Sequence, residues 1–538
     1  MAFLKIASTA LLVAAAFPPW NLDFLIWIAF IPWLSLMENT ISKKKQFQYS
    51  FLLGFLISLL GFYWVAYSLK NYGNLPWPIA IFGLLLFSLF NQPQYVAYGL
   101  LRSWILKKLS NNRSYFFWFP LWGALTYTAC DAFLPKLFLD TNGHAFHQRL
   151  TIMQWAEVGG VHLLTFFTVL SNEIIFRVYS EFKNRKEPSI HPSIKKTLGW
   201  SITWIGVFSF IWLWGDHRLK TIEEIQDKAF KNEKSVFSFT PIQANIGNFE
   251  KVAAEKGIYQ AANHVVDQYI ELSEQALEEN EKIDFLVWPE TAYPSTFRVP
   301  STTNDLFLDQ RIENFVRIRN IPLFFGGYDR KNNLDYNSFF FLKPQVPGKR
   351  DLHVYHKNIL LLFGETIPGA ETFPALKRAF PQVGNFGQGP GPEALSYQTK
   401  DLREIKISPI ICYEILFPSY PIESVKKGGE LLLNITNDSW FGPYGEPALH
   451  FALTKFRSIE TRVPQLRATN TGITALVLPS GAVPYQSAIF EKDIHTYRVP
   501  KLPPISTLML QWGDWFGTFS LILSGLLTLL LIKKPKWL

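Results

Sequence analysis

Long apolar runs are the feature that most constrains this chain. The hydrocarbon core of a bilayer is about 30 Å thick, so a crossing helix needs about 20 apolar residues. Runs close to this length recur through the first 214 residues and once more near the end. We therefore expect a multi-span α-helical membrane domain of about eight helices. The runs cover residues 3–18, 22–38, 51–69, 77–99, 115–134, 152–176, 197–214 and 515–532.

The first two runs leave a choice of topology. They are short, and only Pro18, Pro19, Trp20 and Asn21 separate them, so a re-entrant hairpin is the alternative to two spans. The opening stretch also resembles a signal peptide. It holds a single lysine and has no polar gap before the next apolar run, and we therefore expect it to be retained as a span.

Charge is unevenly distributed along the chain. The 538 residues carry a net charge of +9, which by itself would allow a nucleic-acid partner. Residues 215–513, however, hold 32 Lys and Arg against 34 Asp and Glu, so this region is nearly neutral. The basic excess lies in the loops between apolar runs. This distribution argues against binding to nucleic acid.

The basic loops predict an orientation in the membrane. Every second loop is basic, as the positive-inside rule requires for cytoplasmic loops. The seventh span then exits outward, and both termini lie in the cytoplasm. We expect a membrane domain over 1–214, an extracytoplasmic soluble domain over 215–513, and a last span with a basic tail over 514–538. The basic residues are Lys43–Lys45, Arg102, Lys107, Lys108, Arg113, Arg177, Lys183, Arg185, Lys186, Lys195, Lys196, Lys533, Lys534 and Lys536.

Three acidic residues lie in or near the predicted spans: Asp131, Glu157 and Glu173. Ionisable groups within a membrane are functional candidates by default. For these three we expect solvation at helix ends and hydrogen bonds between helices.

The region between Gly215 and Gly513 alternates short apolar runs with amphipathic stretches. This alternation predicts an α/β domain with buried sheets. The expected helices are 258–279, 305–319 and 449–461. The expected strands are 235–243, 284–288, 322–326, 338–342, 406–411, 430–435 and 474–478.

Cys412 is the first candidate catalytic residue. The only other cysteine, Cys130, falls inside a predicted span and cannot pair with it, so Cys412 is a free thiol outside the cytoplasm. It follows the apolar strand 405–411, and we expect it to open a helix whose free N–H groups and dipole favour the thiolate. An inert, packed thiol is the alternative. Cys130 itself is expected to serve in packing.

Two charged residues complete a possible set for covalent catalysis. Glu290 follows Trp288 and Pro289, where partial desolvation suits a carboxylate that takes a proton from a thiol. Lys357 could favour the thiolate and stabilise the oxyanion of a tetrahedral intermediate, together with a backbone N–H near Cys412. Taken singly, Glu290 and Lys357 could be ordinary surface charges.

With these contexts and spacings, Glu290, Lys357 and Cys412 resemble the Glu-Lys-Cys triad of the nitrilase superfamily. The resemblance extends to Asn437-Asp438-Ser439-Trp440-Phe441-Gly442 and to Arg467-Ala468-Thr469-Asn470-Thr471-Gly472. Together with eight spans, of which the last follows the soluble domain, it covers essentially the whole chain. The chain as a whole resembles the family of bacterial apolipoprotein N-acyltransferases.

The resemblance implies a nitrilase-like αββα sandwich over 215–513 on the periplasmic side of the bacterial inner membrane. It implies a ping-pong reaction in which Cys412 attacks the ester of a phospholipid, usually phosphatidylethanolamine. The thioester then passes its acyl chain to the α-amine of a diacylglyceryl-cysteine lipoprotein. Glu290 would be the general base and Lys357 the oxyanion stabiliser. We expect a monomer, and no cofactor.

Further residues take their roles from the resemblance. Glu365 matches a glutamate that supports the triad, and Tyr413 and Glu414 flank the nucleophile. Trp440 and Phe441 fall in a loop that borders the lipid entrance. The family usually has a proline in the stretch occupied here by Leu361-Leu362-Phe363. It also has Gln-Gly-Asn-Ile-Pro where this chain reads Gln243-Ala244-Asn245-Ile246-Gly247, and a tryptophan near Lys251-Val252. These departures bear on the lid and on the preference for acyl chains.

Two other functions remain open on sequence alone. A thioester can also be resolved by water, so a membrane-tethered amidase or nitrilase acting on a small substrate is the alternative enzyme. A non-catalytic transport or scaffold protein is the second alternative, and the intact triad argues against it. The sequence gives no cluster with metal-ligand spacing, because His353 and His356 have no Cys or His companions nearby.

Overall fold

The computed structural model describes the chain in two compact units. The first comprises 1–70, 75–220 and 511–538, and the second comprises 71–74 and 221–510. The sequence had placed the boundaries at 214/215 and 513/514. Residues 41, 72, 110–117, 185–193, 281, 345–351, 363, 368, 370, 371, 374, 376, 377, 379–385 and 533–538 lie outside the described part.

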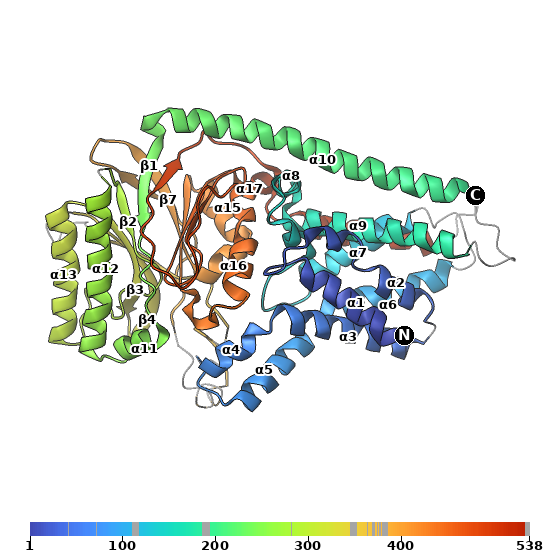
Figure 1. Ribbon diagram of the computed structural model, residues 1–538, viewed down its shortest axis with the longest axis horizontal. Helices are drawn as coiled ribbons and strands as arrows, with labels where there is room; N and C mark the ends of the chain where they lie inside the picture. Colours follow the sequence, from blue (N-terminus) through green and yellow to red (C-terminus); the bar gives the residue numbers. More distant parts are fainter. Residues whose placement is uncertain are drawn as a thin grey trace. The chain divides into compact units, whose positions relative to one another are not determined.

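The first unit is built from helices (Figure 1). The elements are α1 (Ala2–Ala15), η1 (Asp23–Trp27), α2 (Ile31–Glu38), α3 (Lys43–Gly61), α4 (Trp64–Asn71), α5 (Trp77–Phe90), α6 (Pro93–Leu109), α7 (Phe119–Phe133), η3 (Asn142–Phe146), α8 (Leu150–Met153), α9 (Ala156–Asn184), α10 (Ile194–Lys231) and α19 (Phe516–Ile532).

In the described part of the chain, fewer helices are long enough to cross a bilayer than the sequence predicted. Among the described residues, three helical stretches are long and apolar enough to cross a bilayer: Trp77–Leu109, Ala156–Phe182 and Leu198–Lys231. The pair α3 and α4 would make a fourth span, but it bends by 59°. The helices α1 and α19 are apolar and shorter. A count of eight spans therefore stays a prediction.

The predicted second span, 22–38, is not one helix. It forms the 3-10 turn η1 and the eight-residue helix α2. The cause lies in Asn172 on α9, whose side chain accepts a hydrogen bond from Phe30 N at 2.7 Å and donates one to Ile26 O at 2.8 Å. These bonds satisfy backbone groups that a continuous helix would pair internally. The helix α1 packs against α2, as the hairpin alternative requires.

Each of the three acids near the predicted spans has a basic partner. Arg102 Nε donates to Glu173 Oε1 at 2.6 Å, and Arg218 Nε donates to Glu157 Oε1 at 2.6 Å. Lys136 is paired with Asp131. Pairing of this kind is the usual condition for keeping charge away from water. For Glu173 and Glu157 it agrees with the expected hydrogen bonds between helices. 

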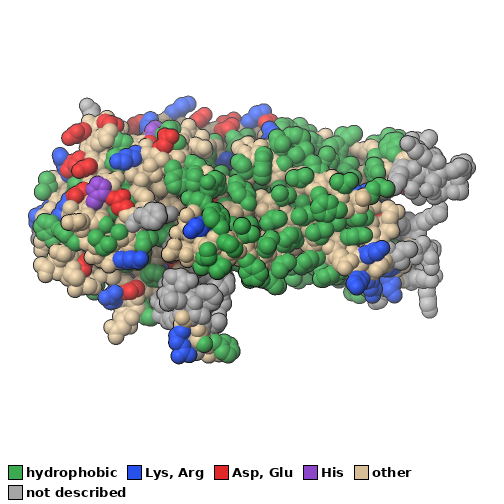
Figure 2. Space-filling model, turned by 60° about the horizontal axis from the view of Figure 1, so that its bottom comes forward, with side chains coloured by type: hydrophobic (Ala, Val, Ile, Leu, Met, Phe, Trp, Pro, Cys, Tyr) green, Lys and Arg blue, Asp and Glu red, His purple; other side chains and the backbone are tan. Residues whose placement is uncertain are grey.

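The helical unit presents a broad hydrophobic face, whereas charged side chains gather on the second unit (Figure 2). Phe90 on α5 is 72% exposed and Leu213 on α10 is 69% exposed. Apolar patches on this scale mark contact with a membrane or another protein. Of the basic residues used to orient the chain, Arg113, Arg185, Lys186, Lys533, Lys534 and Lys536 lie outside the described residues, as do the side chains of Lys183, Lys195 and Lys196.

The second unit contains two β-sheets. One sheet has the strand order β11-β1-β2-β3-β4-β5, and the other has the order β10-β9-β8-β7-β6. The strands β1, β2 and β3 run parallel, and so do β7, β8 and β9. The strands are β1 (Val236–Pro241), β2 (Phe285–Val287), β3 (Leu323–Lys331), β4 (Leu334–Leu342), β5 (Leu352–His356), β6 (Leu395–Gln398), β7 (Glu404–Ile411), β8 (Leu431–Thr436), β9 (Gln465–Thr469), β10 (Ala475–Val477) and β11 (Tyr497–Pro500).

The sheets and helices of this unit form four layers, α-β-β-α, as expected (Figure 1). The helices α12 and α13 cover the outer face of the first sheet, where Tyr269 and Trp288 belong to one core. A second core fills the space between the sheets and includes Phe324 and Leu433. The helices of the unit are η4 (Glu233–Ser235), α11 (Asn248–Glu255), α12 (Tyr259–Glu279), α13 (Thr303–Arg319), η5 (Cys412–Leu416), α15 (Ser419–Lys426), η6 (Asp438–Phe441), α16 (Glu446–Thr454), α17 (Phe456–Thr461) and α18 (Leu508–Trp512).

Some predicted elements need correction. The single helix expected over 449–461 is two helices, α16 and α17, which meet at Lys455. The helix expected to end at residue 214 continues as α10 to Lys231. Its continuation is possible because residues 215–231 contain neither proline nor a further glycine after Gly215. The strands β5, β6, β9 and β11 were not predicted.

Removing the ring of Phe324 tests the packing of the core between the two sheets. The ring is fully buried, and its centroid lies 4.4 Å from that of Phe341 and 5.2 Å from that of Tyr397. We predict that Phe324→Ala lowers the free energy of unfolding by about 3–5 kcal/mol, because it leaves a cavity. Denaturant-induced unfolding of the purified protein measures this loss. Phe307→Ala, at an exposed position on α13, is the control. An equal loss in both variants would contradict the assigned core.

Candidate active site

The three residues singled out by the sequence each follow a strand. Glu290 comes after β2, Lys357 directly follows β5, and Cys412 directly follows β7. Because β2 and β7 belong to different sheets, the site draws on both sheets of the sandwich. Glu290 and Lys357 are in direct contact, and the Cys412 thiol lies within electrostatic reach of both. The fold therefore brings the three groups together.

A buried ion pair forms the centre of the site. Lys357, which is 2% exposed, donates to Glu290 Oε1 at 3.2 Å and to Glu365 Oε1 at 2.9 Å. Asn337 Nδ2 donates to the same two oxygens, at 2.8 Å and 2.7 Å. One ammonium and one amide thus hold two carboxylates side by side. Glu365 is fixed in turn by the Leu361 N–H, which donates to its second oxygen at 2.8 Å.

The second oxygen of Glu290 is also occupied. The backbone N–H of Asn437 donates to Glu290 Oε2 at 2.9 Å, which links the end of β2 to the loop after β8. Behind the turn lies Gly326 on β3, where an added Cβ would sit 2.6 Å from Glu290 Cα and 2.7 Å from Thr291 N. Only glycine leaves room for this close approach. The position of the carboxylate is therefore fixed from three sides.

Charge balance keeps Lys357 protonated. Burial alone would lower the pKa of this amine, but Glu290 and Glu365 outweigh burial and raise the pKa well above its ordinary value. The ammonium is thus a permanent positive charge across the physiological range. A permanent charge of this kind is suited to stabilising a developing oxyanion.

The Cys412 thiol is protonated at neutral pH, which corrects the expectation of a stabilised thiolate. Burial, together with the negative charge of Glu290, raises the pKa of the thiol well above its ordinary value, and Lys357 opposes this only in part. The element that Cys412 opens is the 3-10 helix η5, which is only five residues long. A short turn supplies little dipole. A base is therefore needed to activate the sulfur.

The backbone at Cys412 is in an uncommon conformation. Its φ is +50°, in the left-handed region that residues other than glycine rarely adopt. Part of the side chain remains exposed, and the Thr436 hydroxyl lowers the pKa of the thiol against the larger effect of burial. Strain of this kind is frequent at functional sites, where the surrounding structure holds it in place.

Glu414, two residues after the cysteine, holds the nearby loops together. Its carboxylate accepts from the N–H groups of Ile411 at 2.8 Å and Asn358 at 2.6 Å, and from the Tyr355 hydroxyl at 2.8 Å. Burial raises the pKa of Glu414 to about 7. The carboxylate thereby ties the strand end before Cys412 to the residue after Lys357. Glu414 therefore supports the loops that carry Cys412 and Lys357.

The other residues expected to support the site lie close by. Tyr413 is buried, and its ring meets that of Phe417 edge to face at 5.1 Å. Trp440 and Phe441 form the end of η6 and are half-buried. Leu362 is partly exposed, and Phe363 lies outside the described residues.

The fold also assembles an ionisable cluster that sequence spacing did not reveal. Asp438, Glu446 and His450 are buried, and one possible ligand atom from each lies within 4.8 Å of the others. Arg467 donates to Asp438 Oδ2 at 2.7 Å. Arg467 and His450 lower the pKa of Asp438 against the effect of burial. Arg467 thus already supplies the positive charge that balances Asp438, and the donor set favours an internal ion pair over a metal.

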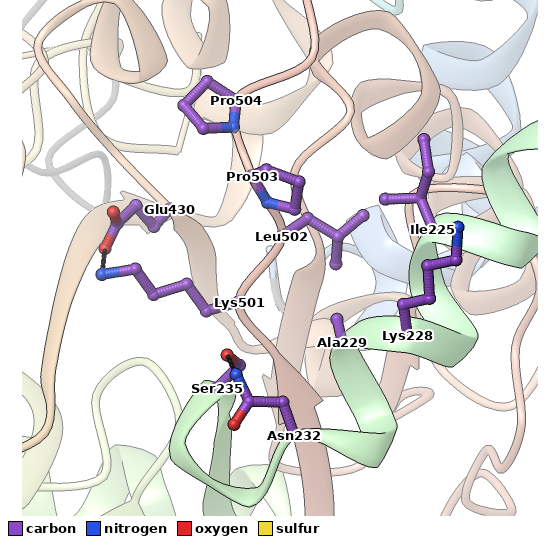
Figure 3. A pocket seen from close by; sticks show the side chains of 10 residues that line it. All are labelled: Ile225, Lys228, Ala229, Asn232, Ser235, Glu430, Lys501, Leu502, Pro503 and Pro504. Atoms are coloured by element: carbon purple, nitrogen blue, oxygen red, sulfur yellow. Dashed lines mark hydrogen bonds and ion pairs between the residues drawn. The ribbon is translucent and has the colours of Figure 1, made fainter.

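A pocket of about 490 Å³ lies at a different place in the second unit (Figure 3). It is lined by residues near the end of α10, such as Ala229, by the segment after β11, and by Glu430 with its partner Lys501. Glu430 precedes β8, whereas Cys412 follows the parallel strand β7. The pocket is therefore at the opposite end of the second sheet from Cys412.

Sequence reasoning missed several contacts of the site. Asn337 lies on β4 and bridges Glu290 and Glu365, yet nothing in its sequence context distinguishes it from other strand asparagines. Asn437 belongs to the motif Asn437–Gly442 noted in the sequence. It contacts Glu290 through its backbone N–H, and the residue type does not predict a backbone contact. Thr436 is the last residue of the apolar strand β8. A hydroxyl at the end of an apolar strand was the sequence signal that could have pointed to it.

Comparisons with known proteins bear on the whole chain. Residues 9–174 match the apolipoprotein N-acyltransferase N-terminal domain, and residues 242–500 match the carbon-nitrogen hydrolase family. The chain is 31% identical to an apolipoprotein N-acyltransferase from Bdellovibrio bacteriovorus, covering 95% of this chain and 89% of that protein. It is 30% identical to one from Geobacter metallireducens, covering 96% and 92%. The chain belongs to the apolipoprotein N-acyltransferase family.

Both parts of an apolipoprotein N-acyltransferase are thus present in one chain. Apart from residues 71–74, the match to the family's N-terminal domain falls within the helical unit. The carbon-nitrogen hydrolase match runs from the residue after β1 to the end of β11 and contains Glu290, Lys357 and Cys412. Among solved structures, an amidase from Nesterenkonia sp. AN1 is similar with a TM-score of 0.36 and 15% identity, covering 50% of this chain and 92% of the amidase. The family assignment rests on the two sequence relatives.

The buried ion pair leads to a prediction about stability. Lys357→Met leaves Glu290 and Glu365 facing one another without a counter-charge, and we expect a loss of about 3–5 kcal/mol in the free energy of unfolding. Adding Glu290→Gln and Glu365→Gln to that variant removes the repulsion and should restore part of the loss. Denaturant-induced unfolding measures both. A triple variant less stable than Lys357→Met alone would contradict the ion-pair assignment.

Proposed function

We propose that the protein transfers an acyl chain from a membrane phospholipid to the N-terminal amine of diacylglyceryl-cysteine lipoproteins. The reaction runs through a thioester on Cys412, with Glu290 as general base and Lys357 as oxyanion stabiliser. The observation that carries the proposal is the buried contact of Lys357 with Glu290 and Glu365, next to a protonated thiol. The family supplies the reaction class.

The first half-reaction forms the thioester. The Glu290 carboxylate accepts the proton of the Cys412 thiol, and the sulfur attacks the ester carbonyl of the phospholipid. The carbonyl oxygen becomes an oxyanion that the Lys357 ammonium stabilises. The C–O bond of the ester then breaks, and Glu290 returns its proton to the departing alkoxide of the lysophospholipid. Glu290 is again ionised when the first product leaves.

The second half-reaction uses the same groups. The uncharged α-amine of the lipoprotein attacks the thioester carbonyl, and Lys357 again faces the oxyanion. Glu290 accepts a proton from the attacking nitrogen as the C–S bond breaks, and it gives that proton to the sulfur. The products are an N-acylated lipoprotein and the free thiol. Glu365 and Asn337 keep Glu290 and Lys357 in register through both steps.

Transfer, as opposed to hydrolysis, depends on where the substrates reside. Withdrawing an acyl chain into water costs about 0.8 kcal/mol per CH₂ group, so both lipid substrates stay in or near the bilayer. The hydrophobic face of the helical unit supports a location in the membrane (Figure 2). A thioester formed there meets a lipid-anchored amine more readily than it meets water.

The remaining expectations form part of the same proposal. The donor is a phospholipid, with phosphatidylethanolamine as the expected headgroup, and the acceptor is a diacylated lipoprotein. The protein acts as a monomer without a cofactor. Tyr413 and Glu414 support the nucleophile, and Trp440 and Phe441 border the route of the lipid. The helical unit lies in the bacterial inner membrane in several passes, with the α/β unit on the periplasmic side and both termini in the cytoplasm.

The thioester gives the first test of this function. Purified protein incubated with phosphatidylethanolamine should gain the mass of one acyl chain on the peptide that contains Cys412, as measured by mass spectrometry. Adding a diacylated lipopeptide should remove this mass and yield a lipopeptide with a third acyl chain. Cys412→Ser should abolish the adduct, whereas Cys130→Ser should leave it intact. An adduct that is lost to water as fast without the lipopeptide as with it would favour a hydrolase.

The orientation can be tested with single cysteines in a Cys130→Ser, Cys412→Ser background. Ser301 lies at an exposed position of the α/β unit, and Lys44 lies at an exposed position in the first turn of α3. We predict that Ser301→Cys reacts with a membrane-impermeant maleimide in intact spheroplasts. Lys44→Cys should react only after lysis. The reverse pattern would overturn the orientation.

A further inference from the structure

A second buried lysine lies beneath the turn that carries Glu290. Lys251 belongs to α11 and is 1% exposed. Its Nζ donates to the carbonyl oxygen of Glu290 at 3.4 Å and to Thr291 Oγ1 at 3.3 Å. A buried ammonium is costly unless polar groups surround it. Here its hydrogen-bond partners belong to the turn that presents Glu290.

The turn needs such support because of its conformation. Thr291 has a φ of +51°, in the left-handed region, which a β-branched residue adopts only under strain. The Thr291 hydroxyl also accepts from Asn437 Nδ2 at 3.4 Å. The backbone of Gly326 leaves no space on the other side of the turn. Lys251 thus brings a positive charge to the backbone carbonyl and the hydroxyl of this strained turn.

We propose that Lys251 is a positioning residue, whose ammonium holds the turn 288–291 so that the Glu290 carboxylate faces Lys357 and Asn337. It does not touch the reacting atoms, and it acts only through the backbone carbonyl of Glu290 and the hydroxyl of Thr291. The inference rests on the proposed function, because it assigns Glu290 the role of base. It adds a group on α11 to a site otherwise built from strand ends and loops.

The protonation state of Lys251 predicts how the reaction rate should depend on pH. Burial lowers the pKa of Lys251 to about 8, with Glu255 and Glu290 opposing the shift. The titratable groups that face it are Glu255 on the same helix, Glu290 after β2, and Tyr328 on β3, which donates to Glu255 Oε1 at 3.0 Å. The pKa values of Lys357 and Cys412 are both raised. As pH rises, Lys251 is thus the first of these three to lose its proton.

Loss of the charge on Lys251 should therefore slow the reaction of Cys412 at alkaline pH. Neutral Lys251 still has two N–H donors, but it no longer attracts the Glu290 carbonyl and the Thr291 hydroxyl as strongly. A small displacement of a general base is enough to lower its efficiency by roughly 10-fold or more. We expect the rate of Cys412 acylation to fall as pH rises through about 8.

The test compares Lys251→Arg, Lys251→Met and the control Lys256→Met, a neighbouring exposed lysine, in a Cys130→Ser background. The rate of acyl-adduct formation on Cys412 is followed from about pH 6 to about pH 10, spanning the ordinary lysine range. Lys251→Arg, whose guanidinium stays charged, should keep its rate above pH 8. Lys251→Met should be slower than the parent by roughly 10-fold or more below pH 8 and should show no step near 8. Lys256→Met should match the parent.

A second readout separates this inference from the proposed function. Alkylation of Cys412 by iodoacetamide requires removal of the thiol proton but no lipid, and it should follow the same pattern. Absence of an acyl adduct with the alkylation pattern intact would refute the function and keep the role of Lys251. A Lys251→Met variant with parental rates and pH profile would overturn the role of Lys251. If Lys251→Arg does not fold, as judged by its thermal midpoint, the comparison of Lys251→Met with the parent decides.

Discussion

The contact of Lys357 with two carboxylates is the interaction on which the rest of the site depends. Removing charges from water is unfavourable, and a buried pair is tolerated only when its geometry and hydrogen bonds are nearly complete. Here Asn337 donates to both carboxylates, and backbone N–H groups donate to the outer oxygens of Glu290 and Glu365. Strands and loops from both sheets must therefore meet correctly for these charges to be buried.

The same electrostatics explain why the cysteine rests as a thiol. Burial raises the pKa of the Cys412 thiol, the carboxylates of Glu290 and Asp438 raise it further, and the Lys357 ammonium opposes them only in part. A resting thiol is less prone to oxidation than a thiolate. In the proposed reaction, removal of the proton depends on Glu290, so the orientation of this carboxylate would control the reactivity of the sulfur.

Sequence reasoning missed several elements, each for a physical reason that the structure shows. The strand β9 is buried throughout, yet it contains Gln465 and Arg467, which hydropathy assigns to the surface. Arg467 is buried because Asp438, from the loop after β8, accepts from it at 2.7 Å. The strands β5 and β6 are short edge strands of their sheets, with five and four residues. The second predicted span failed because Asn172, far along the chain, bonds to its backbone.

The sequence alone determined the class of protein, the α/β sandwich and the identity of the three candidate residues. These follow from apolar runs, from alternating strands and helices, and from motifs whose residues are close together in the chain. Only the tertiary structure decided that Asn337 joins Glu290 to Glu365, that Lys251 lies under the Glu290 turn, and that the thiol keeps its proton. These properties depend on distance and burial between residues far apart in the sequence, and such distances exist only once the chain has folded.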